Sequence, residues 1–417
     1  MGSVIGNGYD GLDSNSPFYR DICTPFTNEY GTDVLLEDRI ADYFNEHLNI
    51  CEKGCAFVNY SVSNNLYTCK CNIKDSVGEG EDNKNLVSKE LPEDFYKKHK
   101  NSNIEVIKCA SQVFSSKGQN KNFGSYVLLV CLAGFIACTI FYFLKGPSKM
   151  KEVFNNLEGN IIPASPPGPK NQESASKQDM GKKPEKVEKD FVINEEQLNY
   201  ADFDIVKKYD TRSYFKIYWS LLKMKQLFIF TFYTYNDYNL RIVKIALFIL
   251  FISFYFAFTA LFFNDSIMRQ IYKYRGNTDA AVHIPNIILS SLSCLIMNFI
   301  VRFVSLNERD ISKINCERNE NNKRDLCRKT KKILKIKLLI LFAVSIILIG
   351  FFWYYVAAFC AVFKNSQGHY FINVLVAFIV CNIWPCVTSL IPPILRRNGI
   401  KNDSSCMYKA SQIIAYI

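Results

Sequence analysis

Apolar residues along this chain are gathered in blocks that alternate with strongly polar stretches. A helix needs about 20 apolar residues to cross the core of a bilayer. Five blocks meet this length. In the second of them the most polar side chains are hydroxyls, so its backbone must satisfy its hydrogen bonds internally as a helix. The predicted spans are residues 123–144, 245–263, 284–304, 338–363 and 370–395.

The last block differs from the others because polar residues and prolines interrupt it, namely Asn373, Asn382, Pro385 and the pair Pro392-Pro393. Proline removes a backbone donor and kinks a helix. A kinked span and a re-entrant segment both fit this pattern. With the other four blocks, it predicts a mainly α fold, a polytopic transmembrane helix bundle, in which residues 245–395 form a four-helix transmembrane region.

The distribution of Lys and Arg between the blocks predicts the orientation. Residues 305–337 carry eleven of them, residues 264–283 carry three, and the connection after the fourth block has Lys364 alone. The positive-inside rule therefore places the basic loop 305–337 in the cytosol, together with the C-terminal tail, residues 396–417. Five spans then leave residues 1–122 outside, in a multi-pass protein of the plasma membrane or an endomembrane.

Two segments between the first and second spans are too polar or too short to be spans. Residues 145–210 contain a run rich in Pro, Ser, Lys and Glu, which predicts a disordered cytosolic linker. Residues 211–241 mix Tyr, Trp and Phe with Lys, which is typical of a helix at the headgroup level. A sixth, broken span is the alternative for this aromatic and basic segment.

Six of the fifteen cysteines precede the first span. An even set of cysteines in a polar, external segment predicts a disulfide framework, here a small disulfide-rich N-terminal extracellular module whose connectivity stays open. Their spacing does not suit a zinc site. Because no apolar signal precedes them, we expect further ectodomain and a signal peptide upstream of residue 1. The disulfide candidates are Cys23, Cys51, Cys55, Cys69, Cys71 and Cys109.

The formal net charge of +11 lies mostly beside the apolar blocks, where anionic lipid headgroups explain it, so nucleic acid is not an expected partner. Two sequons, at Asn59 and Asn264, fall on the outer side and are glycosylation candidates. Neither observation changes the predicted topology.

The sequence contains few residues or motifs that could carry out catalysis. There are four histidines, none in a metal-ligand pair, and no phosphate-binding or nucleophile motif. The acidic cluster around Asp33, Glu37 and Asp38 lacks the ligand ladder of a calcium loop, which favours a solvated turn or helix end. We therefore expect no enzyme, catalytic residue, metal or cofactor.

Polar side chains within the spans are few. Asn298 and Asn382 are candidates for hydrogen bonds between helices of the bundle, and pore lining is the alternative role. No Asp, Glu, Lys or Arg lies at mid-depth, and no inverted repeat is apparent, which weakens a transporter interpretation.

Several long phrases carry a family resemblance: SPFYRDICTPFTNEYGTDVLLEDR, CEKGCAFVNYSVSNNLYTCKCNIK, NDYNLRIVKIALFI, ALFFNDSIM and FFWYYVAAFCAVFKNSQGH. The chain resembles the C-terminal portion of an uncharacterised family of protist multipass membrane proteins with a cysteine-rich, EGF-like ectodomain. The resemblance covers most of the chain outside residues 145–200. It implies an external module but no activity.

Two functions are compatible with these observations. The first is an integral membrane cell-surface protein with a binding or structural role, in which the disulfide-rich ectodomain contacts a partner and the helix bundle is the anchor. The alternative is a channel or transporter subunit with a path through the C-terminal bundle. The expected partners are the lipid bilayer, an extracellular protein or glycan ligand, and a second copy of the chain.

Overall fold

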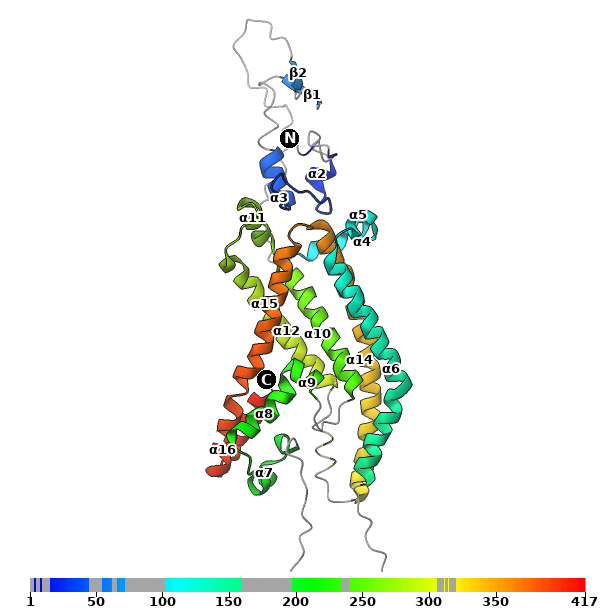
Figure 1. Ribbon diagram of the computed structural model, residues 1–417, viewed down its shortest axis with the longest axis vertical. Helices are drawn as coiled ribbons and strands as arrows, with labels where there is room; N and C mark the ends of the chain where they lie inside the picture. Colours follow the sequence, from blue (N-terminus) through cyan, green and yellow to red (C-terminus); the bar gives the residue numbers. More distant parts are fainter. Residues whose placement is uncertain are drawn as a thin grey trace, which may run out of the picture. The chain divides into compact units, whose positions relative to one another are not determined.

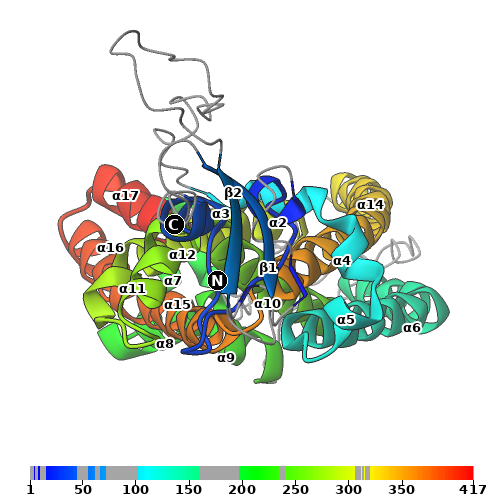
Figure 2. The same ribbon diagram turned by 90° about the horizontal axis from the view of Figure 1, so that it is seen from above.

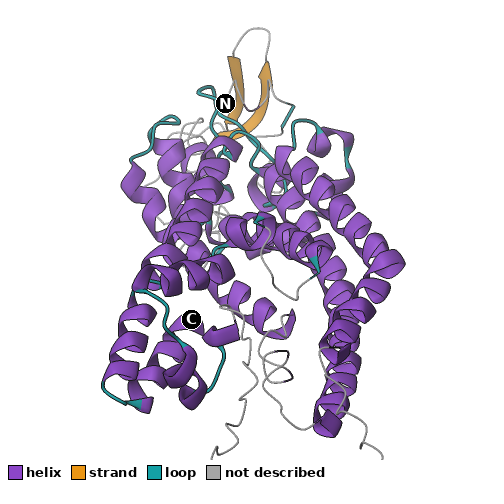
Figure 3. Cartoon of the chain, turned by 60° about the horizontal axis from the view of Figure 1, so that its bottom comes forward, coloured by secondary structure: helices purple, strands orange, loops and turns teal. Residues whose placement is uncertain are grey.

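The computed structural model of the 417-residue chain describes residues 4, 8–9, 16–44, 55–61, 66–71, 102–159, 197–233, 240–305, 311, 314 and 320–416. Helices dominate the described residues, and the one two-stranded sheet among them is a hairpin near the N-terminus (Figure 3). The predicted mainly α class is therefore confirmed.

The elements follow one another along the chain as labelled in Figure 1. In order they are α2 (Pro17–Arg20), α3 (Leu36–Arg39), η1 (Ile40–Phe44), β1 (Cys55–Ser61), β2 (Leu66–Cys71), η3 (Ile104–Lys108), α4 (Ala110–Phe114), α5 (Ser116–Gln119), α6 (Phe123–Gly159), η4 (Gln197–Asn199), α7 (Phe203–Tyr209), α8 (Tyr214–Lys225), α9 (Leu227–Phe232), α10 (Arg241–Phe262), α11 (Asp265–Lys273), α12 (Ala280–Ser305), α14 (Glu320–Val362), α15 (Gln367–Thr388), α16 (Ile391–Lys401) and α17 (Ser405–Tyr416).

Five helical stretches among the described residues are long and apolar enough to cross a membrane, as the sequence predicts. They are Phe123–Leu157, Arg241–Phe262, Ala280–Val301, Asn321–Val362 and Gln367–Lys401. In four of them most of the apolar surface stays exposed in the protein itself, which is the surface that a bilayer would cover, whereas Arg241–Phe262 is mostly buried. The chain is thus a membrane-embedded helix bundle.

Two of the helices extend well beyond the apolar blocks. α14 has 43 residues, or about 64 Å at 1.5 Å per residue, against about 30 Å of bilayer core. α6 continues past Leu144 to Gly159. The linker predicted from residue 145 is therefore wrong over 145–159, and residues 320–337 of the basic loop belong to α14.

A small cluster explains both extensions. Met150, Phe154 and Leu157 recur at helical spacing on α6 and are buried against Cys327 of α14 and Ile314. The apolar stripe on α6 is short and is interrupted by charged residues. Hydropathy along the sequence therefore does not predict that it spans the membrane. It is sufficient to stabilise an amphipathic helix that leaves the apolar region.

The described chain divides into two compact units, and each of the five long helices contributes to both. The first unit comprises residues 1–135, 249–298 and 345–381, and the second comprises 136–248, 299–344 and 382–417. They are described separately below.

In the first unit, residues 16–44, called here the N-terminal segment, have an aromatic core. Phe18, Tyr19 and Phe26 are buried with Val34 and Ile40. Tyr272 of α11 packs against the same cluster, so the segment is completed by a helix far away in sequence. A segment of this length buries too little surface to be stable alone, which is the reason that it folds on the helices rather than as a separate module.

The hairpin pairs β1 and β2 antiparallel, with Cys55 opposite Cys71 and Phe57 opposite Cys69 (Figure 2). A bulge between Phe57 and Asn59 shifts the register. Further along, residues 102–122 form η3, α4 and α5, and Val113 packs on Ala357 and Ala358 of α14. Within the predicted 1–122 module, residues 16–44 and 102–122 therefore pack against the helices. The described residues establish no EGF-like arrangement.

The second unit contains the short helices α7, α8, α9, α16 and α17. Tyr408 of α17 is buried against Ala201 and against Val206 of α7. Residues 197–209 are thus folded, whereas the sequence placed them in the linker; the intervening 160–196 lie outside the described residues. α8 and α9, within the 211–241 segment, have 12 and 6 residues, so each is too short to cross a bilayer core alone.

The proline-rich end of the fifth span is a helix break. α15 ends at Thr388 and α16 begins at Ile391, with Pro392-Pro393 in its first turn, where a missing N–H costs nothing. α15 alone has 22 residues, enough for a crossing. The residues predicted as a C-terminal tail form the rest of α16 and α17.

Candidate functional site

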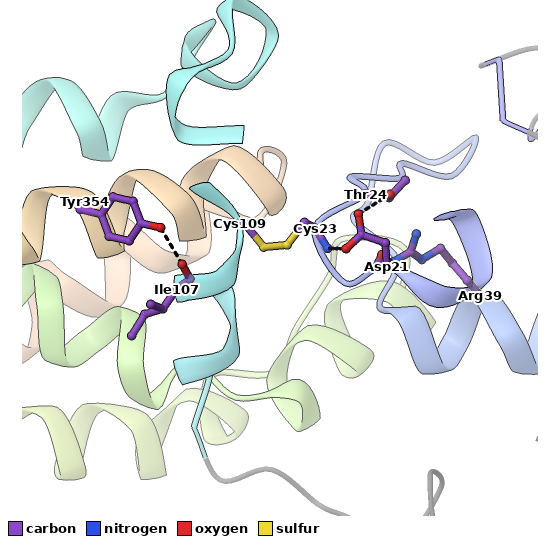
Figure 4. Close-up of a disulfide and its surroundings, with 7 residues drawn as sticks. All are labelled: Asp21, Cys23, Thr24, Arg39, Ile107, Cys109 and Tyr354. Atoms are coloured by element: carbon purple, nitrogen blue, oxygen red, sulfur yellow. Dashed lines mark hydrogen bonds between the residues drawn. A yellow bond between two sulfur atoms is a disulfide. The ribbon is translucent and has the colours of Figure 1, made fainter. Parts of the chain in front are cut away.

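The N-terminal segment is joined to the first unit by a disulfide between Cys23 and Cys109, which lies between η3 and α4 (Figure 4). Asp21 orders the turn on the Cys23 side, since its carboxylate accepts hydrogen bonds from the Cys23 backbone N–H (2.9 Å) and the Thr24 hydroxyl (3.2 Å). On the other side, the hydroxyl of Tyr354 in α14 donates to the Ile107 carbonyl (2.6 Å). The bridge thus closes a loop of 86 residues.

A second junction is made by Asp33, whose carboxylate lies at the N-terminus of α15. Its Oδ2 accepts from the backbone N–H groups of Asn365 and Ser366 (both 2.8 Å) and from the Ser366 hydroxyl (2.9 Å). The first backbone N–H groups of a helix have no partner within the helix, and a carboxylate there also complements the helix dipole. Asp33 therefore caps α15 from more than 300 residues away.

A third junction is an ion pair with α11. Arg269 donates from Nε to Asp38 (2.8 Å) and from Nη2 to Glu37 (2.5 Å), and Tyr272 donates to Asp42 (2.5 Å). Two carboxylates that share one guanidinium form a geometry of charge-assisted bonds with fixed direction. α11 is in turn begun by Asn264, whose side chain accepts from the Ile267 N–H.

Asp33 and Asp38 of the acidic cluster are therefore buried, so the prediction that the cluster is solvated is wrong, whereas Glu37 and Asp38 do lie at a helix end, in the first turn of α3. Asp33 is 3% exposed and Asp38 is 7% exposed. Burial raises the pKa of Asp33 to about 6 against the opposing effect of hydrogen bonds from Ser366 and Asn365. Burial also raises the pKa of Asp38, against the attraction of Arg269. Sequence missed these roles because all partners of these carboxylates lie in α11 or the α14–α15 connection.

A cavity of about 70 Å³ lies beside these junctions. Its walls are mainly apolar, and its charged residues are Arg39 and three carboxylates. Arg39 is 1% exposed; its Nη2 donates to the Asp21 carbonyl (3.2 Å), while Nε and Nη1 have no hydrogen-bond partner among the described residues. Burial lowers the pKa of Arg39 to about 10, so it remains charged at neutral pH. The lining residues are Ile22, Thr24, Pro25, Phe26, Val34, Leu35, Leu36, Glu37, Arg39, Glu105, Asp265, Val362 and Phe363.

The remaining disulfide candidates are only partly described. Cys69 is disulfide-bonded. Cys51 and the side chains of Cys55 and Cys71 lie outside the described residues, as does the side chain of Asn59, a glycosylation candidate. The other candidate, Asn264, is the helix cap of α11.

Of the two predicted bundle contacts, Asn382 has its Oδ1 within 3.3 Å of the Gln226 amide, at the junction of α8 and α9. Asn298 lies on α12 in a series of polar residues at helical spacing, called here the α12 polar stripe: His283, Asn286, Ser290, Cys294 and Asn298. Sequence reasoning singled out the last of these and missed the periodicity, since Ser and Cys are common in spans as small residues.

The N-terminal end of the α12 polar stripe is tied to α15. The two ring nitrogens of His283 lie 3.0 Å from Asn373 Nδ2 and 3.0 Å from Thr278 Oγ1, and its ring stacks on that of His369 (5.7 Å between centroids). Asn286 is 1% exposed, yet neither polar atom of its amide has a hydrogen-bond partner among the described residues. Such a group is costly in an apolar environment.

The second unit contains a buried polar cluster of its own. Arg212 donates from Nε and Nη2 to Asp210 (2.8 and 2.7 Å) and from Nη1 to the Asn199 amide oxygen (3.0 Å). Arg396 of α16 also donates to Asn199, at its Oδ1 and its backbone carbonyl (both 3.1 Å), and lies over the Tyr408 ring. The cluster joins η4 and the connection between α7 and α8 to α16 and α17.

No group of three or more residues that could bind a metal occurs within the described part of the chain. Comparisons of the sequence with family models and curated proteins, and of the fold with solved structures, give no significant match. The function of the chain is therefore inferred from its own structure.

Proposed function

We propose that the chain is a cell-surface membrane protein with a binding or structural role, in which the helix bundle anchors an external N-terminal region. The Cys23–Cys109 disulfide carries this proposal. Disulfides persist in oxidising compartments outside the cytosol, so the face of the first unit that bears this bond faces outward. The distribution of basic residues leads to the same orientation without reference to cysteine, because the positive-inside rule places residues 305–337, with eleven Lys and Arg, in the cytosol, and five spans then leave residues 1–122 outside.

The way in which the N-terminal segment is attached also supports a display role. A covalent bond, a capping carboxylate and a shared ion pair hold one segment to three different helices or connections. These contacts hold the surface of the N-terminal segment in a fixed position, and they need no reactive side chain. The proposal includes no catalytic step, and it agrees with the resemblance to protist multipass surface proteins.

Epitope accessibility tests the orientation. A tag at residue 1 is expected to bind antibody on intact cells, whereas a tag at residue 417 is expected to bind only after permeabilisation. Each tagged chain is the control for the other. If the tag at residue 1 needs permeabilisation, the external placement is wrong.

A channel or transporter subunit is the second candidate, and the α12 polar stripe favours it. A polar side chain that only holds helices together has a partner on the neighbouring helix, as Asn382 does. Asn286 has none among the described residues, and buried polar groups of this kind are usually satisfied by water. Water on one face of α12 is the mark of a hydrated path.

Flux into vesicles that contain the full chain, compared with empty vesicles, tests this candidate. Asn286→Leu is expected to lower any ion or solute flux and to leave the helix content unchanged, and Ile287→Leu, at the adjacent position, is the matched control. Equal flux in protein-containing and empty vesicles for inorganic ions and small solutes would leave only the anchoring role for the bundle.

A further inference from the structure

We propose that one face of α14, at its N-terminal end, is a binding site for a phospholipid whose headgroup carries several phosphates, as in phosphorylated inositol lipids. This inference rests on the proposed orientation, in which residues 305–337 are cytosolic. It adds a specific lipid ligand to the anchoring role of the helix bundle.

The headgroup part of the site is a row of five basic residues, called here the α14 basic stripe. Positions four, seven, eight and eleven after a given residue recur on the same face of a helix. Cys327 and Thr330, in the same turns, are buried, whereas the stripe is exposed apart from one half-buried lysine. None of the five side chains has an ion pair with a carboxylate among the described residues. The stripe consists of Arg324, Arg328, Lys331, Lys332 and Lys335.

The height of the α14 basic stripe exceeds the headgroup layer of an ordinary bilayer. From Lys335 to Arg324 the helix rises about 16.5 Å at 1.5 Å per residue. A tilt of about 40°, at the upper end for transmembrane helices, still leaves about 13 Å along the membrane normal. The headgroup layer on each side of the bilayer core is about 5–7 Å thick. Ordinary phospholipids therefore reach the charge of Lys335 and not that of Arg324, whereas a phosphorylated ring that projects from the surface reaches further.

The charge at this end of α14 also favours a headgroup with several phosphates. Residues 321–337 contain eight Lys or Arg and a single carboxylate, that of Asp325. Juxtamembrane basic clusters of this size attract anionic lipids of the cytosolic leaflet. Because five of these charges lie on one face, a headgroup with a single net charge leaves most of them unpaired, and one with several phosphates is complementary to the face.

The same face of α14 becomes apolar where the predicted span begins. Leu339, Ala343 and Ile346 continue the row beyond Lys335 at helical spacing. Leu339 is 51% exposed, Ala343 is exposed and Ile346 is half-buried, so an acyl chain can lie along them. A row that is basic at one end and apolar at the other matches a lipid, whereas a soluble polyanion would use only the basic end.

Titration calorimetry of the purified full chain in a neutral detergent tests the proposal. The probes are a short-chain phosphatidylinositol bisphosphate, a short-chain phosphatidylserine and soluble inositol trisphosphate. The bisphosphate lipid is expected to bind at least about tenfold more tightly than either of the others, because only this lipid uses both the basic and the apolar part of the row.

The double variant Arg328→Gln with Lys332→Gln is expected to weaken binding of the bisphosphate lipid about thirtyfold, since two stripe charges are lost. Both side chains are exposed, so the helix content is expected to stay unchanged. The matched control is Lys145→Gln with Lys149→Gln, which removes two exposed charges at the same spacing from α6. This control is expected to change the affinity by less than about threefold, in keeping with a more distant pair of charges.

The proposal is overturned if phosphatidylserine or inositol trisphosphate binds as tightly as the bisphosphate lipid, or if the two double variants weaken binding equally. The tag experiment is independent of these measurements, because lipid in detergent reaches both ends of the helices. Inaccessibility of the tag at residue 1 on intact cells would refute the orientation, even if the lipid binds to α14.

Discussion

Each of the two units buries arginine, but the two units satisfy it differently. In the second unit, Arg212 has a carboxylate on Nε and Nη2 and an amide oxygen on Nη1. In the first unit, Arg39 has one carbonyl and an aromatic ring, and two of its nitrogens have no partner among the described residues. The two side chains have similar burial and different chemistry.

This difference predicts different contributions of the two side chains to stability. A buried charge each of whose nitrogens donates a hydrogen bond, as with Arg212, holds local chain segments together. A buried charge beside a cavity with donors unused gives the fold little stability. We therefore expect the same substitution to have opposite consequences in the two units.

The largest expected effect is that of Arg212→Met. It leaves the carboxylate of Asp210, which is 0% exposed, without its cation, and the loss of one partner of a buried pair costs about 3–5 kcal/mol. Arg39→Met is expected to change the free energy of unfolding by less than about 1 kcal/mol or to raise it. Denaturant unfolding in detergent measures both, and equal losses would contradict the distinction.

Removal of the disulfide is expected to have an effect of similar size, and this effect is confined to the first unit. Cys23→Ser opens a loop of 86 residues, which corresponds to a loss of about 4–5 kcal/mol in the chain-entropy model. Hydrogen exchange is expected to increase in residues 16–44 and not in α7 or α17. Cys406→Ser, which changes an exposed free thiol, is the control. Increased exchange in the second unit as well would show that the bridge does not act locally.

The pH dependence of the N-terminal segment has a sign that follows from Asp33. Its pKa is about 6 in the folded chain and near 3.8 otherwise, so the folded state binds the proton more tightly between these values. The free energy of unfolding is therefore expected to fall as the pH rises from about 4 to about 6, by up to about 3 kcal/mol. Above that range Asp33 contributes no further change.

Hydrogen exchange of residues 16–44 at pH 5 and pH 7.5, corrected for the intrinsic rate, measures this effect. Slower exchange is expected at the lower pH. Asp33→Asn, which does not titrate, is expected to flatten the dependence, with a smaller part remaining from Asp38, whose pKa burial also raises. A segment that is more protected at the higher pH would contradict the sign.

The smallest expected effect belongs to Asn382 in the second unit. Asn382→Leu removes its contact with Gln226 and is expected to cost about 0.6 kcal/mol, the average for hydrogen bonds between helices in a bilayer, and at most about 1.7 kcal/mol. Gln226→Leu is expected to give a similar loss, and the double variant less than the sum. Independent, additive losses would mean that the contact contributes no coupling energy.

The spans were predictable because the requirement for them is local. A bilayer core demands about 20 consecutive apolar residues, and Arg241–Phe262 satisfies this demand within one stretch of sequence. The extension of α6 to Gly159 was not predictable from hydropathy, since its stabilising contacts come from Ile314 and Cys327. The burial of Asp33 was equally hidden, because its partners are Asn365 and Ser366.

The sequence by itself therefore determined the helical class, the positions of the five spans and the loop that is rich in basic residues. Each of these depends on composition within a short window of sequence. Only the tertiary structure decided that Cys23 pairs with Cys109, that Asp33 caps α15, and that Arg212 donates to a carboxylate while two nitrogens of Arg39 have no hydrogen-bond partner in the described part of the chain. Pairings over such distances depend on which surfaces meet when the helices pack. Local propensity and hydrophobic periodicity contain no information about this.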